Sequence, residues 1–328
     1  MSFADLPTIN ESVSGIRVLV TGGAGFIGSH TVDLLLNRGA EVWVLDNLSS
    51  GSLRNLKLCK RNPKFHFRKG TVTQYRLLDS LTKKTDAIIH LAAIVSPYFS
   101  VKKPEIVNEV NVSGTLNVLR AALKNKLERT VFASSSSVYG NQSTLPISED
   151  NPLHPVTPYG VSKLAGEKYC GSYYRTYGLN TVSLRYFNVY GERQSANPYS
   201  GVIAIFAKRL AQGAQPTIHG DGEQTRDFIH VSDVARANIR ALQTNSGLGE
   251  AFNIGTGVAT TINHLYSVLA KMYGRTDIAP VHTDTRPGDI RESYANIAGA
   301  RNILGFEPKI ELNEGLKTLI SSLRPKNA

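Results

Sequence analysis

The sequence T-G-G-A-G-F-I-G occupies residues 21–28 and decides which fold the chain adopts. It follows an apolar run, 16–20, that is typical of a buried strand. It leads into residues 26–38, whose spacing predicts a helix that ends at Gly39. Its glycines satisfy both G-x-G-x-x-G and G-x-x-G-x-x-G, which allow a tight turn and let the backbone approach a pyrophosphate. The stretch therefore predicts a dinucleotide-binding loop between a strand and a helix.

An acidic residue lies where such a loop needs one. Asp46 directly follows the predicted strand 42–45, eighteen residues after Gly28. A carboxylate at this point accepts hydrogen bonds from the adenosine ribose and repels a 2′-phosphate, which favours NAD over NADP. The alternative is that Asp46 only caps a loop.

The first half of the chain alternates predicted strands with predicted helices. Further strands are expected at 66–68, 87–90 and 130–133, and a helix is expected over 106–124. Short connections between such elements predict an α/β fold, a Rossmann doubly wound parallel sheet with helices on both faces.

Three regions follow from changes in composition along the chain. Residues 1–14 form a short extension with neither the basic nor the apolar part of a signal peptide. The NAD-binding domain is expected over 15–183, with part of 225–256 returning to it. Residues 184–328 mix short strands, loops and helices, and predict a smaller α/β lobe that binds the substrate.

Composition indicates an ordinary globular protein, with 41% hydrophobic and 19% charged residues. No apolar run reaches the roughly 20 residues that span a bilayer. The two cysteines have no metal-site or disulfide spacing, so we expect a cytoplasmic protein with free thiols and no metal. The net charge of +11 suits an anionic small substrate, and because the basic residues are scattered outside 60–69, a solvated surface is favoured over a nucleic-acid patch.

The pentapeptide Y-G-V-S-K (159–163) begins a predicted helix that continues to about Tyr177 and ends at Gly178. Tyr159 and Lys163 are four residues apart, so they share one helix face. A tyrosine with its ordinary pKa of about 10 is a poor base at neutral pH. Two nearby cations, the Lys163 ammonium and an oxidised nicotinamide ring, could lower that pKa by roughly three units, which needs about 4 kcal/mol.

Four consecutive serines, 134–137, follow the predicted strand 130–133. A serine run is usually a flexible linker. A strand that ends in hydroxyl groups instead closes on solvent or presents those groups to a ligand.

Taken in order, these motifs resemble those of extended short-chain dehydrogenases/reductases of the sugar-nucleotide epimerase/dehydratase group, and most of all UDP-hexose 4-epimerases. The resemblance runs over residues 21–289, nearly the whole chain. After the glycine loop its motifs are DNLSSG (46–51), HLAA (90–93), NVSGT (111–115), SSSSVYG (134–140), YGVSK (159–163), RYFNVYGERQ (185–194), TRDFIHVSDV (225–234), FNIGTG (252–257) and RPGD (286–289).

The resemblance implies a role for each residue that matches a family motif. Ser135 hydrogen-bonds the sugar O4 and the Tyr159 hydroxyl, Lys163 completes the catalytic set, and the other three serines pack, cap or line the pocket. The implied NAD contacts are Gly22, Gly25, Phe26, Ile27, Gly28, Asp46, Asn47, Ser50, Gly51, Thr71, Val72, Leu91, Ala92, Ala93, Asn111, Tyr159 and Lys163. The implied contacts to the UDP-sugar are Ser135, Ser136, Asn188, Val202, Arg226, Arg286, Asp289 and Ser293.

The residues after Ser135 favour epimerisation over elimination. Related 4,6-dehydratases carry Asp-Glu at the next two positions, where water elimination needs an acid and a base. Ser136 and Ser137 cannot supply them. A dehydratase or reductase is therefore the second choice of enzyme, and a non-enzymatic NAD-binding module is the third interpretation.

The resemblance also implies which sugars the cleft can accept. Epimerases restricted to unmodified hexoses carry a bulky tyrosine at the position of Ser293, so a serine there predicts room for a 2-N-acetyl group. UDP-glucuronate epimerases share the serine run, but they usually carry threonine where this chain has Asn188. The family often has an acid near the adenine, where this chain has 70–72, Gly-Thr-Val.

Relatives of this group commonly form homodimers through two helices, which correspond here to 112–124 and 159–177. The expected partners are accordingly a UDP-sugar and a second copy of the chain, with no nucleic acid and no membrane.

Overall fold

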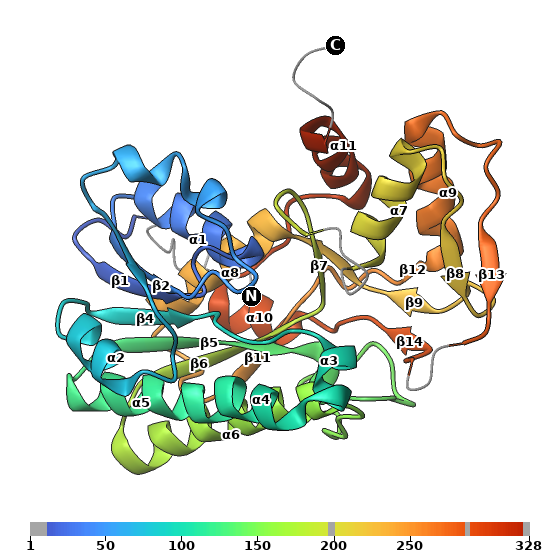
Figure 1. The fold of residues 1–328 in the computed structure, drawn as a ribbon. Helices are drawn as coiled ribbons and strands as arrows, with labels where there is room; N and C mark the ends of the chain where they lie inside the picture. Colours follow the sequence, from blue (N-terminus) through green and yellow to red (C-terminus); the bar gives the residue numbers. More distant parts are fainter. Residues whose placement is uncertain (1–11, 196–200, 286–288, 324–328) are drawn as a thin grey trace, which may run out of the picture.

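A seven-stranded parallel sheet forms the centre of the larger lobe, with the order β11-β6-β5-β4-β1-β2-β3 (Figure 1). The computed structural model describes residues 12–195, 201–285 and 289–323. The strands of this sheet are β1 (Arg17–Thr21), β2 (Glu41–Asp46), β3 (Phe65–Lys69), β4 (Ala87–His90), β5 (Arg129–Ser135), β6 (Thr181–Tyr186) and β11 (Ala251–Ile254).

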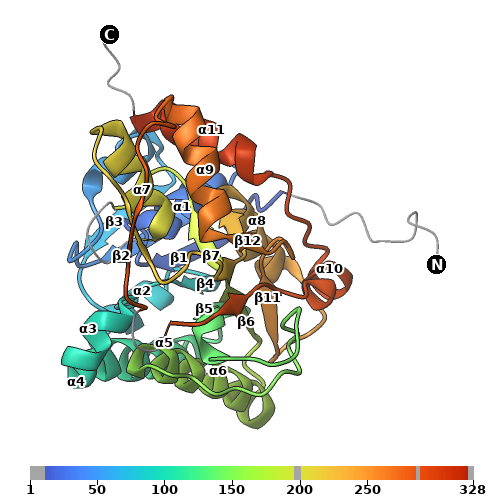
Figure 2. The same ribbon diagram turned by 90° about the vertical axis from the view of Figure 1, so that its right-hand side faces the viewer.

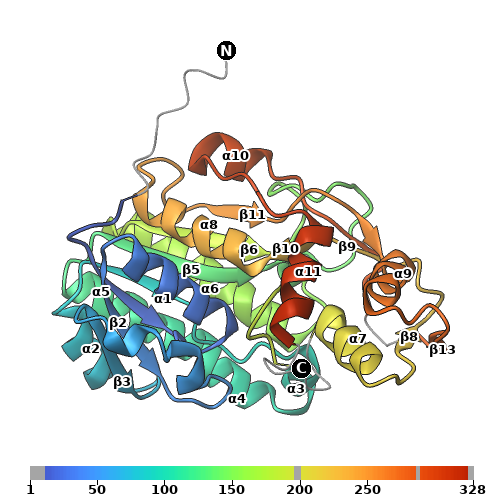
Figure 3. The same ribbon diagram turned by 90° about the horizontal axis from the view of Figure 1, so that it is seen from above.

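Helices cover both faces of this sheet. Helices α1 (Phe26–Asn37) and α8 (Val231–Gln243) lie side by side on one face (Figures 1 and 3). The other face carries α2 (Tyr75–Thr82), α5 (Gly114–Lys124) and α6 (Pro158–Tyr177) (Figure 1). The predicted doubly wound Rossmann fold is confirmed.

Burial on both faces explains why the interior of β1, residues 18–20, is apolar throughout. Val18 and Val20 of β1 pack into a core with side chains of α1 and α8. Leu19, which points to the opposite face, packs with α2 and α5. All three side chains are fully buried, as expected for a parallel strand between two helical layers.

The predicted helix 106–124 is interrupted. The structure divides this region into α4 (Pro104–Asn108), a π-helical turn (Glu109–Ser113) and α5. Such π-helical turns occur frequently at functional sites. This one contains Asn111, whose role is described below.

The second lobe has a core of its own. It is built around α7 (Val202–Ala211), α9 (Ile262–Tyr273) and α11 (Leu312–Leu323), which stand together in Figure 2. Short strands complete the structure outside the main sheet: β7 (Asn188–Tyr190) pairs with β10 (Phe228–His230), β8 (Thr217–His219) with β13 (Val281–Thr283), and β9 (Thr225–Arg226) with β12 (Thr260–Thr261) and β14 (Glu292–Ser293).

Chain segments cross between the lobes. Strand β6 runs past residue 183, and β11 and α8 return to the main sheet from the later part of the chain. Helix α10 (Ala298–Leu304) also packs against β11 and α8. The boundaries proposed at 14 and 183 stay a prediction.

Within the described ranges, the helices include none whose length and apolar character would let it cross a membrane. Cys59 and Cys170 are both free and buried.

Candidate functional site

A cleft of about 1430 Å³ opens at the carboxyl ends of the main strands. Segments that follow β1, β2, β4, β5 and β6 line it, together with residues of β9 and β14. Strands β2 and β4 flank β1 on opposite sides, so the chain reverses direction across the sheet here, where doubly wound sheets bind their ligands. The volume exceeds the roughly 300–1,000 Å³ of a pocket for one small ligand, which suits two ligands bound side by side.

The glycine loop forms one wall of this cleft. Gly22 has a φ of +71°, and a Cβ added to Gly28 would stand 2.1 Å from the Gly22 carbonyl oxygen. The helix that follows has no acidic side chain in its first turn. Its first backbone N–H groups lack intrahelical acceptors, as in every α-helix, so they can bind an anion. This wall therefore fits the pyrophosphate of a dinucleotide.

Asp46 is held rigidly beside this loop. Its carboxylate accepts hydrogen bonds from the amides of Ala24 (2.9 Å) and Leu48 (2.7 Å). It therefore does cap a loop, but an ionised carboxylate offers about four acceptor positions. The remaining lone pairs can accept the hydroxyl groups of a ribose.

Most of the predicted site residues line this one cleft. All predicted cofactor contacts do so except Gly51 and Asn111, and all predicted substrate contacts do so except Val202, which begins α7, and Arg286, which lies outside the described residues. Gly51 packs against the backbone of Ala24 behind the glycine loop.

Asn111 stands behind the cleft and joins two of its walls. Its side chain accepts from the Ile94 amide (2.8 Å) and donates to the Ile94 carbonyl (3.0 Å). It also donates to Ser162 Oγ (2.9 Å), which in turn donates to the Tyr159 carbonyl (2.7 Å). Asn111 thus fixes the segment after β4 relative to the first turn of α6.

His90 extends this buried hydrogen-bond chain to β1. Thr115 Oγ1 donates to the Asn111 carbonyl, 2.5 Å away, so it accepts from His90 Nε2 (3.0 Å). His90 Nδ1 then accepts from Thr21 Oγ1 (2.7 Å). Burial and, to a smaller extent, the nearby Lys163 lower the pKa of His90 to about 3, so the ring is neutral and connects its two hydroxyl partners.

Ser135 and Tyr159 meet at the end of β5. Ser135 Oγ accepts hydrogen bonds from the amide (3.2 Å) and the hydroxyl (2.9 Å) of Ser137, so its own proton is available to donate. Burial raises the pKa of Tyr159, and the hydrogen bond with Ser135 lowers it by a smaller amount. A hydrogen bond donated by Ser135 favours the phenolate.

Lys163 is buried at the wall of the cleft, and its Nζ donates to the Ala133 carbonyl (2.8 Å). Burial lowers the pKa of Lys163 to about 7. In the protein alone, burial raises the pKa of Tyr159, and the predicted depression, which needs the nicotinamide ring as a second cation, stays a prediction. The physical reason is that the same desolvation disfavours both charged forms.

Sequence reasoning missed the segment that follows β4. Helix α3 (Pro97–Lys102) and the residues before it line the cleft and leave apolar side chains partly exposed. The Ser-Pro pair at 96–97 signals a helix start, since Ser96 Oγ caps α3 by accepting from the Phe99 amide. The newly found lining residues here are Ile94, Val95, Ser96, Pro97, Tyr98, Val101 and Lys102.

The opposite wall comes from the second lobe. Arg226 Nη2 donates to Asp289 Oδ1 (2.6 Å), and Nη1 donates to the Ile290 carbonyl (2.7 Å). Ser293 is only 6% exposed and pairs with Arg226 between β14 and β9. A cation, a carboxylate and a small hydroxyl therefore line the same cleft as the serine-tipped end of β5.

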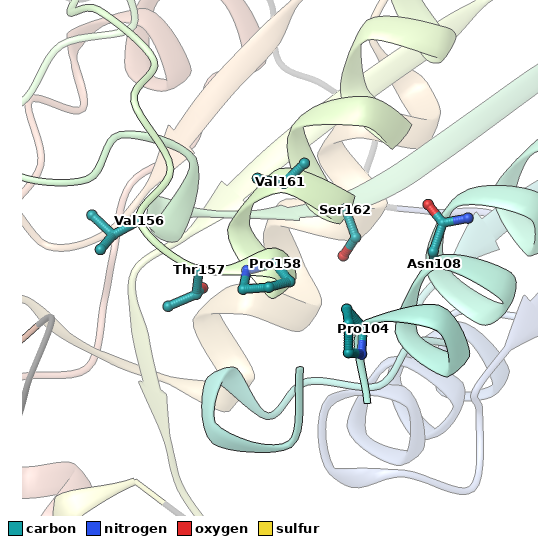
Figure 4. A pocket seen from close by; sticks show the side chains of 7 residues that line it. All are labelled: Pro104, Asn108, Val156, Thr157, Pro158, Val161 and Ser162. Carbon is teal, nitrogen blue, oxygen red and sulfur yellow. The ribbon is translucent and has the colours of Figure 1, made fainter. Parts of the chain in front are cut away.

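A smaller pocket of about 450 Å³ lies outside the first turn of α6 (Figure 4). Pro104 and Asn108 on α4 border it opposite Pro158 and Ser162, and Val161 is exposed beside them. The described residues that line it include no cationic or acidic side chain.

Comparison with known proteins places this arrangement in a family. The model of the NAD dependent epimerase/dehydratase family matches residues 18–255. The UDP-glucose 4-epimerase of Mycolicibacterium smegmatis is 40% identical over 95% of this chain and 100% of its own.

Solved structures agree. A UDP-glucose 4-epimerase from Thermotoga maritima, crystallised with UDP-glucose, is 40% identical with a TM-score of 0.89, covering 94% of this chain and 98% of its own. A UDP-N-acetylglucosamine 4-epimerase from Methanobrevibacter ruminantium, in complex with UDP-N-acetylmuramic acid, is 36% identical with a TM-score of 0.90, over 94% and 98% of the two chains. The family expected from the motifs is confirmed: the chain belongs to the NAD-dependent epimerase/dehydratase family.

Proposed function

We propose that the protein is an NAD-dependent UDP-hexose 4-epimerase. It interconverts UDP-glucose and UDP-galactose through a transient 4-keto sugar, and it also accepts the corresponding UDP-N-acetylhexosamines. The observation that carries this proposal is the meeting of Ser135, Tyr159 and Lys163 at the end of β5, inside a cleft that also contains the glycine loop.

The side chains divide the proton chemistry between them. Tyr159 Oη accepts the proton of the sugar O4 hydroxyl, and Ser135 donates its one free proton either to O4 or to the phenolate. Bound oxidised NAD would supply a positive ring and an acceptor for the C4 hydride, which would return to the opposite face of C4 after the keto sugar has turned over. Lys163 Nζ, which donates to the Ala133 carbonyl, is assigned the role of stabilising the phenolate.

The nucleotide must stay anchored while the keto sugar turns over. We assign this role to Arg226, Asp289 and Asn188, since a guanidinium binds phosphate oxygens in a planar, bidentate manner. Arg286, which the family resemblance adds to this set, lies outside the described residues.

We assign the adenosine half of NAD to the part of the cleft that lies away from the proposed UDP-sugar contacts. Asp46 and Asn47 are proposed to hold the ribose, and Thr71 and Val72 to border the adenine. The residues proposed to contact the pyrophosphate and the nicotinamide ribose are Gly22, Gly25, Phe26, Ile27, Gly28, Ser50, Leu91, Ala92 and Ala93.

The serine run at the end of β5 disfavours a 4,6-dehydratase. Ser136 and Ser137 line the cleft at the two positions where elimination would need an acid and a base. A uronate 4-epimerase would need a cation near C6, and Lys102 is the lining residue that could be tested for that role.

The reaction is tested by proton NMR of the purified protein incubated separately with UDP-galactose, UDP-N-acetylgalactosamine and UDP-glucuronate, without added cofactor. We expect the C4 epimer from the first two, because the cofactor must stay bound for the keto sugar to be reduced. A 4-keto-6-deoxy product, or no epimer from any of them, would contradict the proposal.

A Ser293→Tyr variant isolates the contribution of sugar size. Ser293 is buried in β14 at the cleft wall, so a phenol there would occupy the space proposed for the 2-N-acetyl group. We expect turnover of UDP-N-acetylgalactosamine to fall by more than about 10-fold, while turnover of UDP-galactose changes by less than about threefold. Ser293→Ala, which adds no volume, is the matched control. Equal losses on both substrates would remove Ser293 from the specificity argument.

We further propose a cytoplasmic homodimer that buries the outer face of α5 and α6. Val161, Tyr169 and Tyr177 of α6 are 53%, 38% and 57% exposed, and the pocket of Figure 4 adjoins the first of them. Light scattering of the purified protein decides between a mass near 36 kDa and twice that value, given 35.7 kDa for one chain.

A further inference from the structure

A buried ion pair connects the catalytic helix to the main sheet. Arg185 of β6 and Glu167 of α6 are each 5% exposed at the side chain. Arg185 Nη2 donates to Glu167 Oε1 (2.6 Å) and Nε donates to Oε2 (3.0 Å), so the contact is bidentate. Such geometry restricts both the distance and the angle between the two elements.

Glu167 continues the row of residues that contains the proposed catalytic groups. Tyr159, Lys163 and Glu167 are four residues apart in turn, so they lie along one face of α6. Each contacts a neighbouring residue at the end of β5. Tyr159 contacts Ser135, and Lys163 Nζ donates to the Ala133 carbonyl. Glu167 Oε2 accepts from Ser134 Oγ (2.9 Å).

The third nitrogen of Arg185 faces away from α6. Nη1 donates to Tyr139 Oη (2.6 Å) and to the Glu149 carbonyl (3.2 Å), and the guanidinium lies 4.9 Å from the Tyr139 ring centre. Tyr139 Oη donates to Asn253 Oδ1 (2.6 Å). Tyr139 is fully buried, so this part of the chain of contacts is also closed to solvent.

Asn253 carries the connection to the wall that contains Ser293. Its Nδ2 donates to the carbonyls of Ile147 (2.9 Å) and Asn296 (3.2 Å). Ile147 also forms a parallel bridge with Ala295, two residues after Ser293. One guanidinium therefore contacts the catalytic helix on one side and, through two side chains, the substrate wall on the other.

We propose that Glu167 and Arg185 are positioning residues for the epimerase reaction. They hold α6 so that Tyr159 and Lys163 face Ser135, and they keep this arrangement in register with the strand of Ser293. The inference rests on the proposed function. A buried ion pair contributes little net stability compared with apolar residues of similar size, whereas its geometry is restrictive, so position is the property most affected by its loss.

The decisive variant replaces both partners, as Glu167→Leu with Arg185→Met. This change approximately keeps the volume and leaves no buried charge unpaired, but Ser134 Oγ and Tyr139 Oη each lose a partner, so the melting temperature should fall by several degrees while the fold persists. We expect kcat for UDP-galactose to fall about 10- to 100-fold with KM changed less than about threefold, since a displacement of about 1 Å can cost 10²-fold. A double variant with the wild-type kcat would overturn the proposal.

Two further variants separate a loss of helix position from a general loss of stability. Arg185→Lys retains the charge and loses the planar fork, so it should lose about 10-fold in kcat even if the double variant does not fold, and a change below twofold would count against the role. Arg236→Met removes an ion pair with Asp233 of α8, neither of which lines the cleft. It should lower the melting temperature without lowering kcat of the folded enzyme, and an equal loss of kcat there would contradict a specific role for Arg185.

A failure of the proposed epimerase function can be distinguished from a failure of the positioning role. If the wild type epimerises no UDP-sugar, hydrogen exchange measured by mass spectrometry still reports the position of the helix. Faster exchange in the first turns of α6 (158–167) in the double variant supports positioning, and unchanged exchange overturns it.

Discussion

The Tyr159→Phe variant is expected to lose about 10²- to 10⁴-fold in kcat, the range associated with removal of a general acid–base group. Phenylalanine keeps the ring in its buried position and removes only the oxygen that meets Ser135. Without that oxygen, Ser135 cannot take over as the acceptor of the O4 proton, because its Oγ already accepts hydrogen bonds from two donors of Ser137. The measurement is the initial rate of UDP-glucose formation from UDP-galactose, followed by NMR.

Tyr169→Phe supplies the matched control for this change. Tyr169 lies on the same helix and is 38% exposed, outside the residues that line the cleft. Its hydroxyl should be dispensable in the rate assay. A Tyr159→Phe protein that retains a third or more of the wild-type kcat would show that another group removes the proton.

The Gly28→Ala variant is expected to lose its bound cofactor and, with it, more than about 100-fold of its activity without added NAD. The added methyl group would stand 2.1 Å from the Gly22 carbonyl oxygen and 2.8 Å from Gly23 Cα. Backbone atoms cannot yield as a flexible side chain can, so the loop must open and its amides leave the positions that face a pyrophosphate. The NAD released by denaturing the purified protein, counted per chain, measures the effect directly.

Gly274→Ala separates this effect from a general loss of stability. Gly274 ends α9 with a φ of +63°, and a Cβ there would meet no atom within 4 Å. The substitution costs about 1–2 kcal/mol through its left-handed backbone alone. It should lower the melting temperature and leave the NAD content unchanged. A Gly28→Ala protein with one NAD per chain would mean that the loop is not the pyrophosphate site.

Local signals in the sequence determined the fold and much of the cleft. The glycine pattern after an apolar strand, the acid of Asp46 and the four-residue spacing of Tyr159 and Lys163 all act over short distances along the chain. Their geometry follows from one turn or one helix face, so it can be derived without tertiary contacts. The structure places all of these residues in the same cleft.

Tertiary packing decided the local geometry and the charge states that the sequence patterns did not determine. The helix at 106–124 contains a π-helical turn, which places Asn111 against Ile94 and Ser162 rather than in the cleft. The pKa of Lys163 depends on its enclosure, since desolvation acts on whatever surrounds the group and not on its neighbours in sequence.

Connections between positions far apart in the chain are the least visible in the sequence. Tyr139 and Asn253 are 114 positions apart, and Arg226 and Asp289 are 63 apart, yet each pair is joined by a hydrogen bond of 2.6 Å. No periodicity relates such residues, because the order of strands in the sheet brings them together. The sequence by itself thus determined the fold class and the chemical groups of the site, whereas the distances and charges among those groups arose only from the packing of distant segments.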